Sequence, residues 1–143
     1  MRKKGDDKMM LRKSGYKATP ARLAILNVFK RAKKPLSAQE VIETLHETDQ
    51  ATVYRTLKSL EEKGILRHID LRHNHAHYEL ADLAEHHHLV CLECGKIEIV
   101  HHCGMEETQN RIVRSSKHFA EIKQHALEFY GVCKSCAARQ KKL

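Results

Sequence analysis

The sequence predicts an α+β fold built from two consecutive parts, the first of three helices and a hairpin, the second of short strands and one helix. Apolar residues recur at helical spacing in three segments before residue 65 and at strand spacing in shorter segments after it. Two Cys-x-x-Cys pairs lie beyond residue 90 and indicate that the second part is held by its cysteines. A chain of 143 residues with 41% hydrophobic residues can form one domain or two small ones.

The first two helices are predicted from their start signals. The polar residues before Pro20 are expected to be frayed, and Pro20 itself suits the first turn of a helix over 20–32. Ser37 and Glu40 have the Ser-x-x-Glu form of a capping box, which opens a second helix through Leu45.

A third helix is predicted over 49–64, with Gly64 as its stop. Its two faces differ in polarity. The apolar stripe contains Val53, Leu57 and Leu60, and the opposite face contains Ala51, Arg55, Lys58 and Glu62.

Strand patterns follow the third helix. Residues 65–70 and 77–81 resemble a hairpin with a His-rich turn at 72–75. Three helices and a hairpin are the order of a winged helix-turn-helix, which we assign to residues 1–81.

The second domain is predicted over 86–143, after a hinge at 82–85. It is expected to be a small α/β domain. Its predicted elements are strands over 87–91, 96–100 and 119–129 and a helix over 105–116.

Positive charge is concentrated in the first half of the chain. Residues 1–68 contain 16 Lys and Arg against 8 Asp and Glu, whereas residues 69–143 contain 10 of each. Of the 12 histidines, only His46 precedes His68. This asymmetry favours a first half that faces a polyanion and a second half that faces cations, with a solvated basic surface as the alternative.

Since no apolar run approaches the roughly 20 residues that cross a bilayer, and no secretory signal is present, we expect a cytoplasmic protein without a membrane partner.

The paired cysteines have the spacing of a zinc site. Cys91 and Cys94 form one pair and Cys133 and Cys136 the other, with 38 residues between the pairs. Two intervening residues let one turn present both sulfurs to the same ion, and four thiolates suit structural Zn²⁺. Two separate redox pairs are the alternative. Cys103 has no partner nearby in sequence and is expected to be a spectator.

Three motifs closely resemble the ferric uptake regulator superfamily. They are Gln-Ala-Thr-Val-Tyr-Arg-Thr-Leu at 50–57, the run Glu-His-His-His-Leu-Val-Cys-Leu-Glu-Cys-Gly at 85–95, and Tyr-Gly-Val-Cys-Lys-Ser-Cys at 130–136. The resemblance covers about 17–136 and implies a homodimeric, metal-responsive transcription regulator, in which the second domain mediates dimerisation. Its implied partner is a double-stranded DNA operator, with no small organic substrate.

The resemblance also implies which residues meet DNA. The helix over 49–64 is expected in the major groove, where Arg forks onto guanine or phosphate and Tyr or Thr contacts phosphate or a thymine methyl. The expected DNA-contacting residues are Lys17, Arg22, Thr52, Tyr54, Arg55 and Lys58.

Two regulatory metal sites are implied by the resemblance. Alternate residues of a strand share a face, so the His86–His88 triplet can serve two sites. The interdomain site would be formed by Glu79, His86 and His88, and the second site by His87, Glu106 and His125. Imidazole with carboxylate suits Zn²⁺, Fe²⁺, Mn²⁺ or Ni²⁺, and the sequence does not choose among them.

The chain departs from the family pattern at two positions of the interdomain site. Pro35 stands where a His is usual, and Ile99 stands where an acidic residue is usual, with Glu98 one place earlier. Three histidines of the hairpin region could supply replacement ligands, namely His68, His75 and His77. For His75 and His77 an ordinary surface role is favoured.

Other functions are less consistent with the sequence. A peroxide sensor of the same superfamily would use iron to oxidise a ligand histidine, but Ile99 replaces the usual acidic residue. An enzyme is not expected, because the chain has no nucleophile–base pair and no metalloprotease helix motif. A metal-storage protein without DNA binding is disfavoured by the basic first half.

Overall fold

The structure is a computed structural model that describes residues 4–72 and 75–142. The chain forms two compact units, Met1–Leu83 and Ala84–Leu143. The boundary falls inside the range 82–85, and a hinge at that range stays a prediction.

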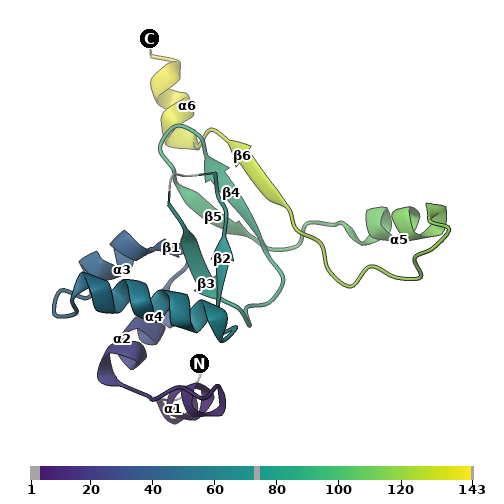
Figure 1. The fold of residues 1–143 in the computed structure, drawn as a ribbon. Coiled ribbons are helices and arrows are strands. Elements are labelled where there is room, and N and C mark those ends of the chain that lie inside the picture. The colour runs from purple at the N-terminus through teal and green to yellow at the C-terminus, as the bar shows by residue number, and fades with distance from the viewer. Residues whose placement is uncertain (1–3, 73–74, 143) are drawn as a thin grey trace. The chain divides into compact units, whose positions relative to one another are not determined.

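The first unit has the predicted order of helices and hairpin (Figure 1). The three predicted helices are present as α2 (Pro20–Arg31), α3 (Ala38–Thr44) and α4 (Gln50–Glu62). Strands β2 (Leu66–Ile69) and β3 (His77–Leu80) form the antiparallel hairpin. Residues 73 and 74 of the predicted turn lie outside the described residues. A two-residue strand, β1 (Leu36–Ser37), pairs with β3 and completes a sheet of order β1-β3-β2.

The starts of α3 and α4 are fixed by side-chain caps. Ser37 Oγ accepts the backbone N–H of Glu40 at 3.3 Å, while Glu40 Oε2 accepts the backbone N–H of Ser37 at 2.8 Å, which confirms the predicted capping box. Asp49 caps α4, because its Oδ1 accepts the backbone N–H of Thr52 at 2.9 Å. These bonds satisfy amide groups that a helix start leaves without intrahelical partners.

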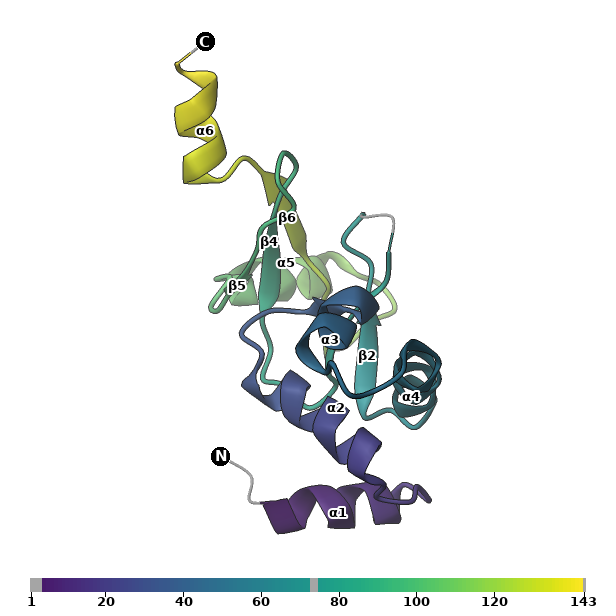
Figure 2. The same ribbon diagram turned by 90° about the vertical axis from the view of Figure 1, so that its left-hand side faces the viewer.

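The expectation of a frayed N-terminus was wrong, because residues 4–13 form a further helix, α1 (Lys4–Lys13). Leu11 of α1 is fully buried in the apolar core formed by α2, α3, α4 and the sheet. Asp7 adds an ion pair with Lys30 of α2 at 2.8 Å. Figure 2 shows α1 next to α2. This polar helix is therefore held by tertiary contacts, namely apolar packing of Leu11 and Met10 and one ion pair, which its helix propensity does not predict.

The second unit is built on a sheet of order β5-β4-β6 (Figure 1). Strands β4 (His87–Cys91) and β5 (Ile97–Val100) are antiparallel, while β6 (Glu128–Gly131) runs parallel to β4. The predicted helix is present as α5 (Glu106–Ser115), and a short unpredicted helix, α6 (Lys134–Gln140), follows β6.

The predicted strand over 119–129 was wrong in extent. Residues 121–127 have no regular secondary structure, and β6 begins only at Glu128. Its neighbour β4 has five residues, so a longer strand would lack a hydrogen-bonding partner along most of its length.

Each helix in the described ranges is too short or too polar to traverse a lipid bilayer.

Candidate metal centres and nucleic-acid surface

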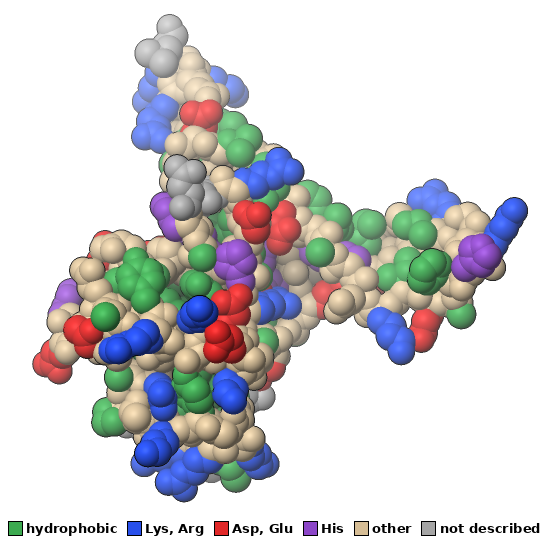
Figure 3. Space-filling model, in the orientation of Figure 1, with side chains coloured by type: hydrophobic (Ala, Val, Ile, Leu, Met, Phe, Trp, Pro, Cys, Tyr) green, Lys and Arg blue, Asp and Glu red, His purple; other side chains and the backbone are tan. Residues whose placement is uncertain are grey.

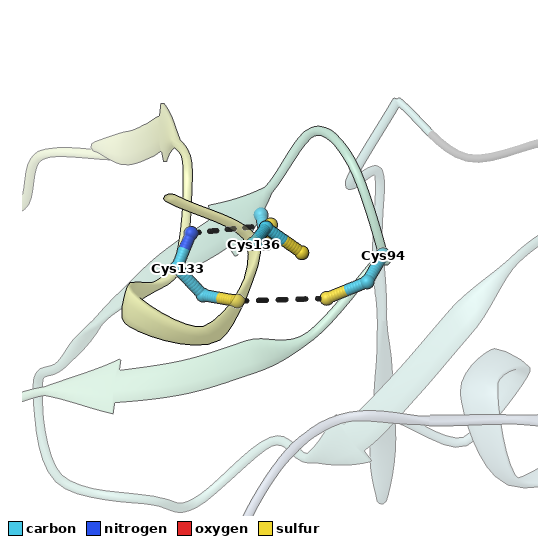
Figure 4. A group of neighbouring side chains, drawn as sticks. Cys94, Cys133 and Cys136 are labelled. Carbon is cyan, nitrogen blue, oxygen red and sulfur yellow. Dashed lines mark hydrogen bonds between the residues drawn. The ribbon is translucent and has the colours of Figure 1, made fainter. Parts of the chain in front are cut away.

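The four paired cysteines meet at one end of the second unit. Cys91 ends β4, Cys94 lies in the turn that follows, and Cys133 and Cys136 lie at the start of α6. The parallel pairing of β4 with β6 brings the two pairs together. Their sulfurs all lie within 4.8 Å of one another, and the thiols of Cys94, Cys133 and Cys136 point toward one another (Figure 4).

The distances fit a tetrahedral ion. The sulfurs of Cys94 and Cys133 are 3.7 Å apart. A tetrahedron with Zn–S bonds of about 2.3 Å has edges of about 3.8 Å. The cluster therefore has the donor chemistry and the spacing of a structural Zn²⁺ site.

Hydrogen bonds prepare one thiol of this cluster for ionisation. The backbone N–H of Cys133 donates to the sulfur of Cys91 at 3.2 Å, and this bond, with a further one from the backbone of Cys94, lowers the pKa of Cys91 to about 6. Arg139 donates to the sulfur of Cys136 at 2.9 Å and favours its thiolate, but burial and the neighbouring thiols outweigh it and raise the pKa of Cys136 to about 11. A bound cation would favour all four thiolates together.

A second cluster in the same unit joins His87 on β4, Cys103 before α5, and His125 before β6. The Nε2 atom of His125 is 3.0 Å from Nε2 of His87 and 3.3 Å from the sulfur of Cys103. Glu106, the carboxylate expected at this site, lines the same cavity of about 630 Å³ but does not belong to the close group.

His86 and His88 also lie together, as the strand alternation predicted. Their ring centroids are 5.0 Å apart and both side chains are buried. His86 Nδ1–H donates to the carbonyl of Ala84 at 2.7 Å, and His88 Nδ1–H donates to the Glu128 carboxylate at 3.2 Å. Since a carbonyl and a carboxylate can only accept, Nδ1 carries a proton in both rings.

The other residues considered for the interdomain site lie on different elements. Glu79 on β3 is paired with Arg67 on β2, with Oε1 2.6 Å from Nε. Ile99 lies opposite His88 in the β4–β5 register, and Pro35 is fully buried. Among the described residues, His68, His75 and His77 belong to no group of three metal-ligand side chains.

Helix α4 presents a polar face to solvent. Val53, Leu57 and Leu60 are buried in the core, whereas Tyr54 is 55% exposed. Arg55 and Lys58 are also exposed. The expected apolar stripe is thus confirmed.

The other expected DNA contacts are partly engaged within the chain. The Thr52 hydroxyl donates to Asp49 at 2.6 Å. The Arg22 guanidinium lies 3.8 Å from the ring centroid of Tyr16 and donates to the Lys17 carbonyl at 2.9 Å, while the Lys17 side chain is exposed. Lys and Arg side chains gather over the part of the first unit formed by α1 and α2 (Figure 3).

Comparison with known proteins identifies the family. Residues 13–130 match the model of the ferric uptake regulator family. The chain belongs to the ferric uptake regulator family. It is 39% identical over 138 residues to the ferric uptake regulation protein of Neisseria gonorrhoeae, covering 92% of this chain and 94% of that protein.

Solved structures of ferric uptake regulators are also similar. The Vibrio cholerae regulator is 32% identical, with a TM-score of 0.78, over 90% of this chain and 100% of that one. The Helicobacter pylori regulator is 26% identical, with a TM-score of 0.79, over 95% of each chain. The fold expected from the sequence, a winged helix followed by an α/β domain with four clustered cysteines, is therefore confirmed.

In this member of the ferric uptake regulator family, three residues outside the expected site lie against the candidate ligands. Glu85 Oε1 is 2.9 Å from His125 Nδ1, Glu128 contacts His88, and Cys103 contacts His125. Glu85 lies in a bend before β4, so strand alternation does not predict its contact with His125. Nothing in the local sequence of Glu128 or Cys103 indicates these partners.

Proposed function

We propose that the protein is a homodimeric, metal-responsive transcription regulator that represses its operators from the cytoplasm. The observation that carries this proposal is the polarity of α4, whose apolar face is buried while Tyr54, Arg55 and Lys58 are exposed. A helix that exposes Tyr54, Arg55 and Lys58 next to a hairpin suits the major groove. The related Vibrio cholerae regulator has DNA-binding domains.

The four-cysteine cluster would hold a structural Zn²⁺. Thiolate–zinc bonds supply folding energy to a small domain. Regulation would come from an ion held by Glu79, His86 and His88, and a further ion would lie at His87 and His125 near Glu106. The Helicobacter pylori relative has three functional metal-binding sites.

Dimerisation is supported by an apolar patch on the sheet of the second unit. Leu89 and Phe129 are paired in the β4–β6 register and are 41% and 43% exposed. Such neighbouring exposed apolar side chains favour an interface with a second copy. A symmetric dimer would set its two recognition helices about 34 Å apart, or a multiple of this distance, on a near-palindromic operator.

Operator selection from a random-sequence duplex library tests the function. The metal-loaded protein is expected to enrich near-palindromic sites, and fluorescence anisotropy on an enriched site is expected to show weaker binding after the regulatory metal is removed and zinc retained. Equal affinity in both states would refute metal responsiveness. Failure to enrich any sequence at moderate salt would refute specific DNA binding.

A further inference from the structure

We propose that Cys103 is a thiolate ligand of the second metal site, which is thereby a His87–Cys103–His125 site selective for thiophilic ions. The inference rests on the proposed presence of a metal at His87 and His125 and specifies its donor set. It concerns a cysteine that belongs to neither Cys-x-x-Cys pair.

The distances between the donor atoms support this ligand set. A tetrahedral ion with Zn–N bonds of about 2.05 Å and a Zn–S bond of about 2.3 Å has N–N edges of about 3.3 Å and N–S edges of about 3.6 Å. The corresponding distances are 3.0 Å between His87 and His125 and 3.3 Å between His125 and Cys103. Each edge needs to lengthen by only about 0.3 Å.

The hydrogen bonds of His125 direct the correct ring nitrogen toward the cluster. Its Nδ1 is 2.9 Å from Glu85 Oε1 and 2.5 Å from Nε2 of Gln109, whose side-chain amide can turn its oxygen toward the same ring nitrogen. A carboxylate accepts the Nδ1 proton and leaves the Nε2 lone pair directed at Cys103 and His87. Glu85 is therefore a positioning residue of the carboxylate–histidine–metal kind.

The access and the donor chemistry of the site suit an exchangeable ion. His87 is buried, whereas Cys103 and His125 are partly exposed at a cavity of about 630 Å³. Two imidazoles and one thiolate are softer donors than two imidazoles and a carboxylate, so Zn²⁺ and Co²⁺ are favoured over Mn²⁺. Glu106, which lines the same cavity, stays outside the coordination shell.

Cobalt spectroscopy on the 143-residue chain tests the proposal. Zinc is first loaded to one equivalent to fill the four-cysteine cluster, Co²⁺ is then added, and metal analysis checks that the equivalent of zinc stays bound. Because Glu79, His86 and His88 carry no sulfur, a sulfur-to-cobalt charge-transfer band reports a thiolate outside that cluster. The wild type is expected to show the band, Cys103→Ser to lose it, and Glu106→Gln to keep it.

The outcomes separate this proposal from the proposed function. Bound Co²⁺ without a charge-transfer band, or a band that survives Cys103→Ser, overturns the Cys103 ligand and leaves the second metal site standing. If the protein binds only the one equivalent of Co²⁺ expected at Glu79, His86 and His88, the Cys103 ligand and the second metal site are both overturned. Metal-dependent operator binding, measured by anisotropy on the same samples, reports independently on the proposed regulator. Glu85→Gln is expected to weaken Co²⁺ at this site by about 10- to 100-fold.

Discussion

Replacing the exposed Cys94 by Ser separates a metal-ligand role from a packing role. Cys94 lies in the turn after β4, and its side chain reaches solvent, so its removal creates no cavity. Exposed substitutions away from special features usually change the free energy of unfolding by less than about 0.5 kcal/mol. A metal ligand behaves differently, because the binding energy of the ion is part of the folding energy.

The size of the effect follows from the small apolar core of the second unit. Among its described residues, the buried hydrophobic side chains are Val90 and Ile97, together with the thiols Cys91 and Cys136. Burial of two aliphatic side chains contributes about 3–6 kcal/mol, whereas structural Zn²⁺ contributes about 10–16 kcal/mol. A quarter of the latter, about 2.5–4 kcal/mol, is the expected loss for Cys94→Ser, which is enough to open the second unit.

Hydrogen exchange measured by mass spectrometry resolves the two units. Peptides from β4 and β6 are expected to lose protection in Cys94→Ser, together with one equivalent of zinc, while peptides from α4 keep theirs. Glu93→Ser, in the same exposed turn, is the matched control and is expected to behave as the wild type. Equal protection and equal zinc content in the two variants would refute the zinc-clamp reasoning.

Three further outcomes are expected. Arg55→Ala should weaken binding to a selected operator by about 1–3 kcal/mol and relax base preference, whereas Lys58→Ala should weaken binding to DNA of every sequence by a similar amount. An unchanged ratio of specific to non-specific affinity for Arg55→Ala in competition anisotropy contradicts the base-reading role of Arg55. Ser37→Ala should lower the free energy of unfolding by about 1 kcal/mol through loss of the capping box, and an unchanged denaturant unfolding midpoint contradicts this. Glu128→Gln should loosen the ion at His88 by about 10-fold or more in metal titration, with exposed Glu121→Gln as control; equal affinities exclude an orienting role.

Much of the first unit could be predicted because its signals are local. The capping box, the cap of α4 and the buried stripe of α4 each depend on residues within about four positions. The helix α1 could not be predicted in this way. It is held by Leu11 in the core and by a pair between Asp7 and Lys30, which are 23 residues apart.

For the second unit, spacing and alternation identified the four cysteines as one group and assigned His86 and His88 to one face of β4 and His87 to the other. The length of β6 was decided by the length of β4, its pairing partner. The neighbours of His125 and His88 were likewise decided by the path of the chain, which brings Cys103 to His125 across 22 residues and Glu128 to His88 across 40.

The sequence by itself determined the starts of α2, α3 and α4, the buried face of α4 and the chemistry of the cysteine pairs, because backbone hydrogen bonding and side-chain periodicity act over a few residues. Only the tertiary structure decided which thiol joins which imidazoles and which carboxylate orients each ring. These choices depend on contacts between distant segments, and their geometry exists only once the sheet of the second unit has formed.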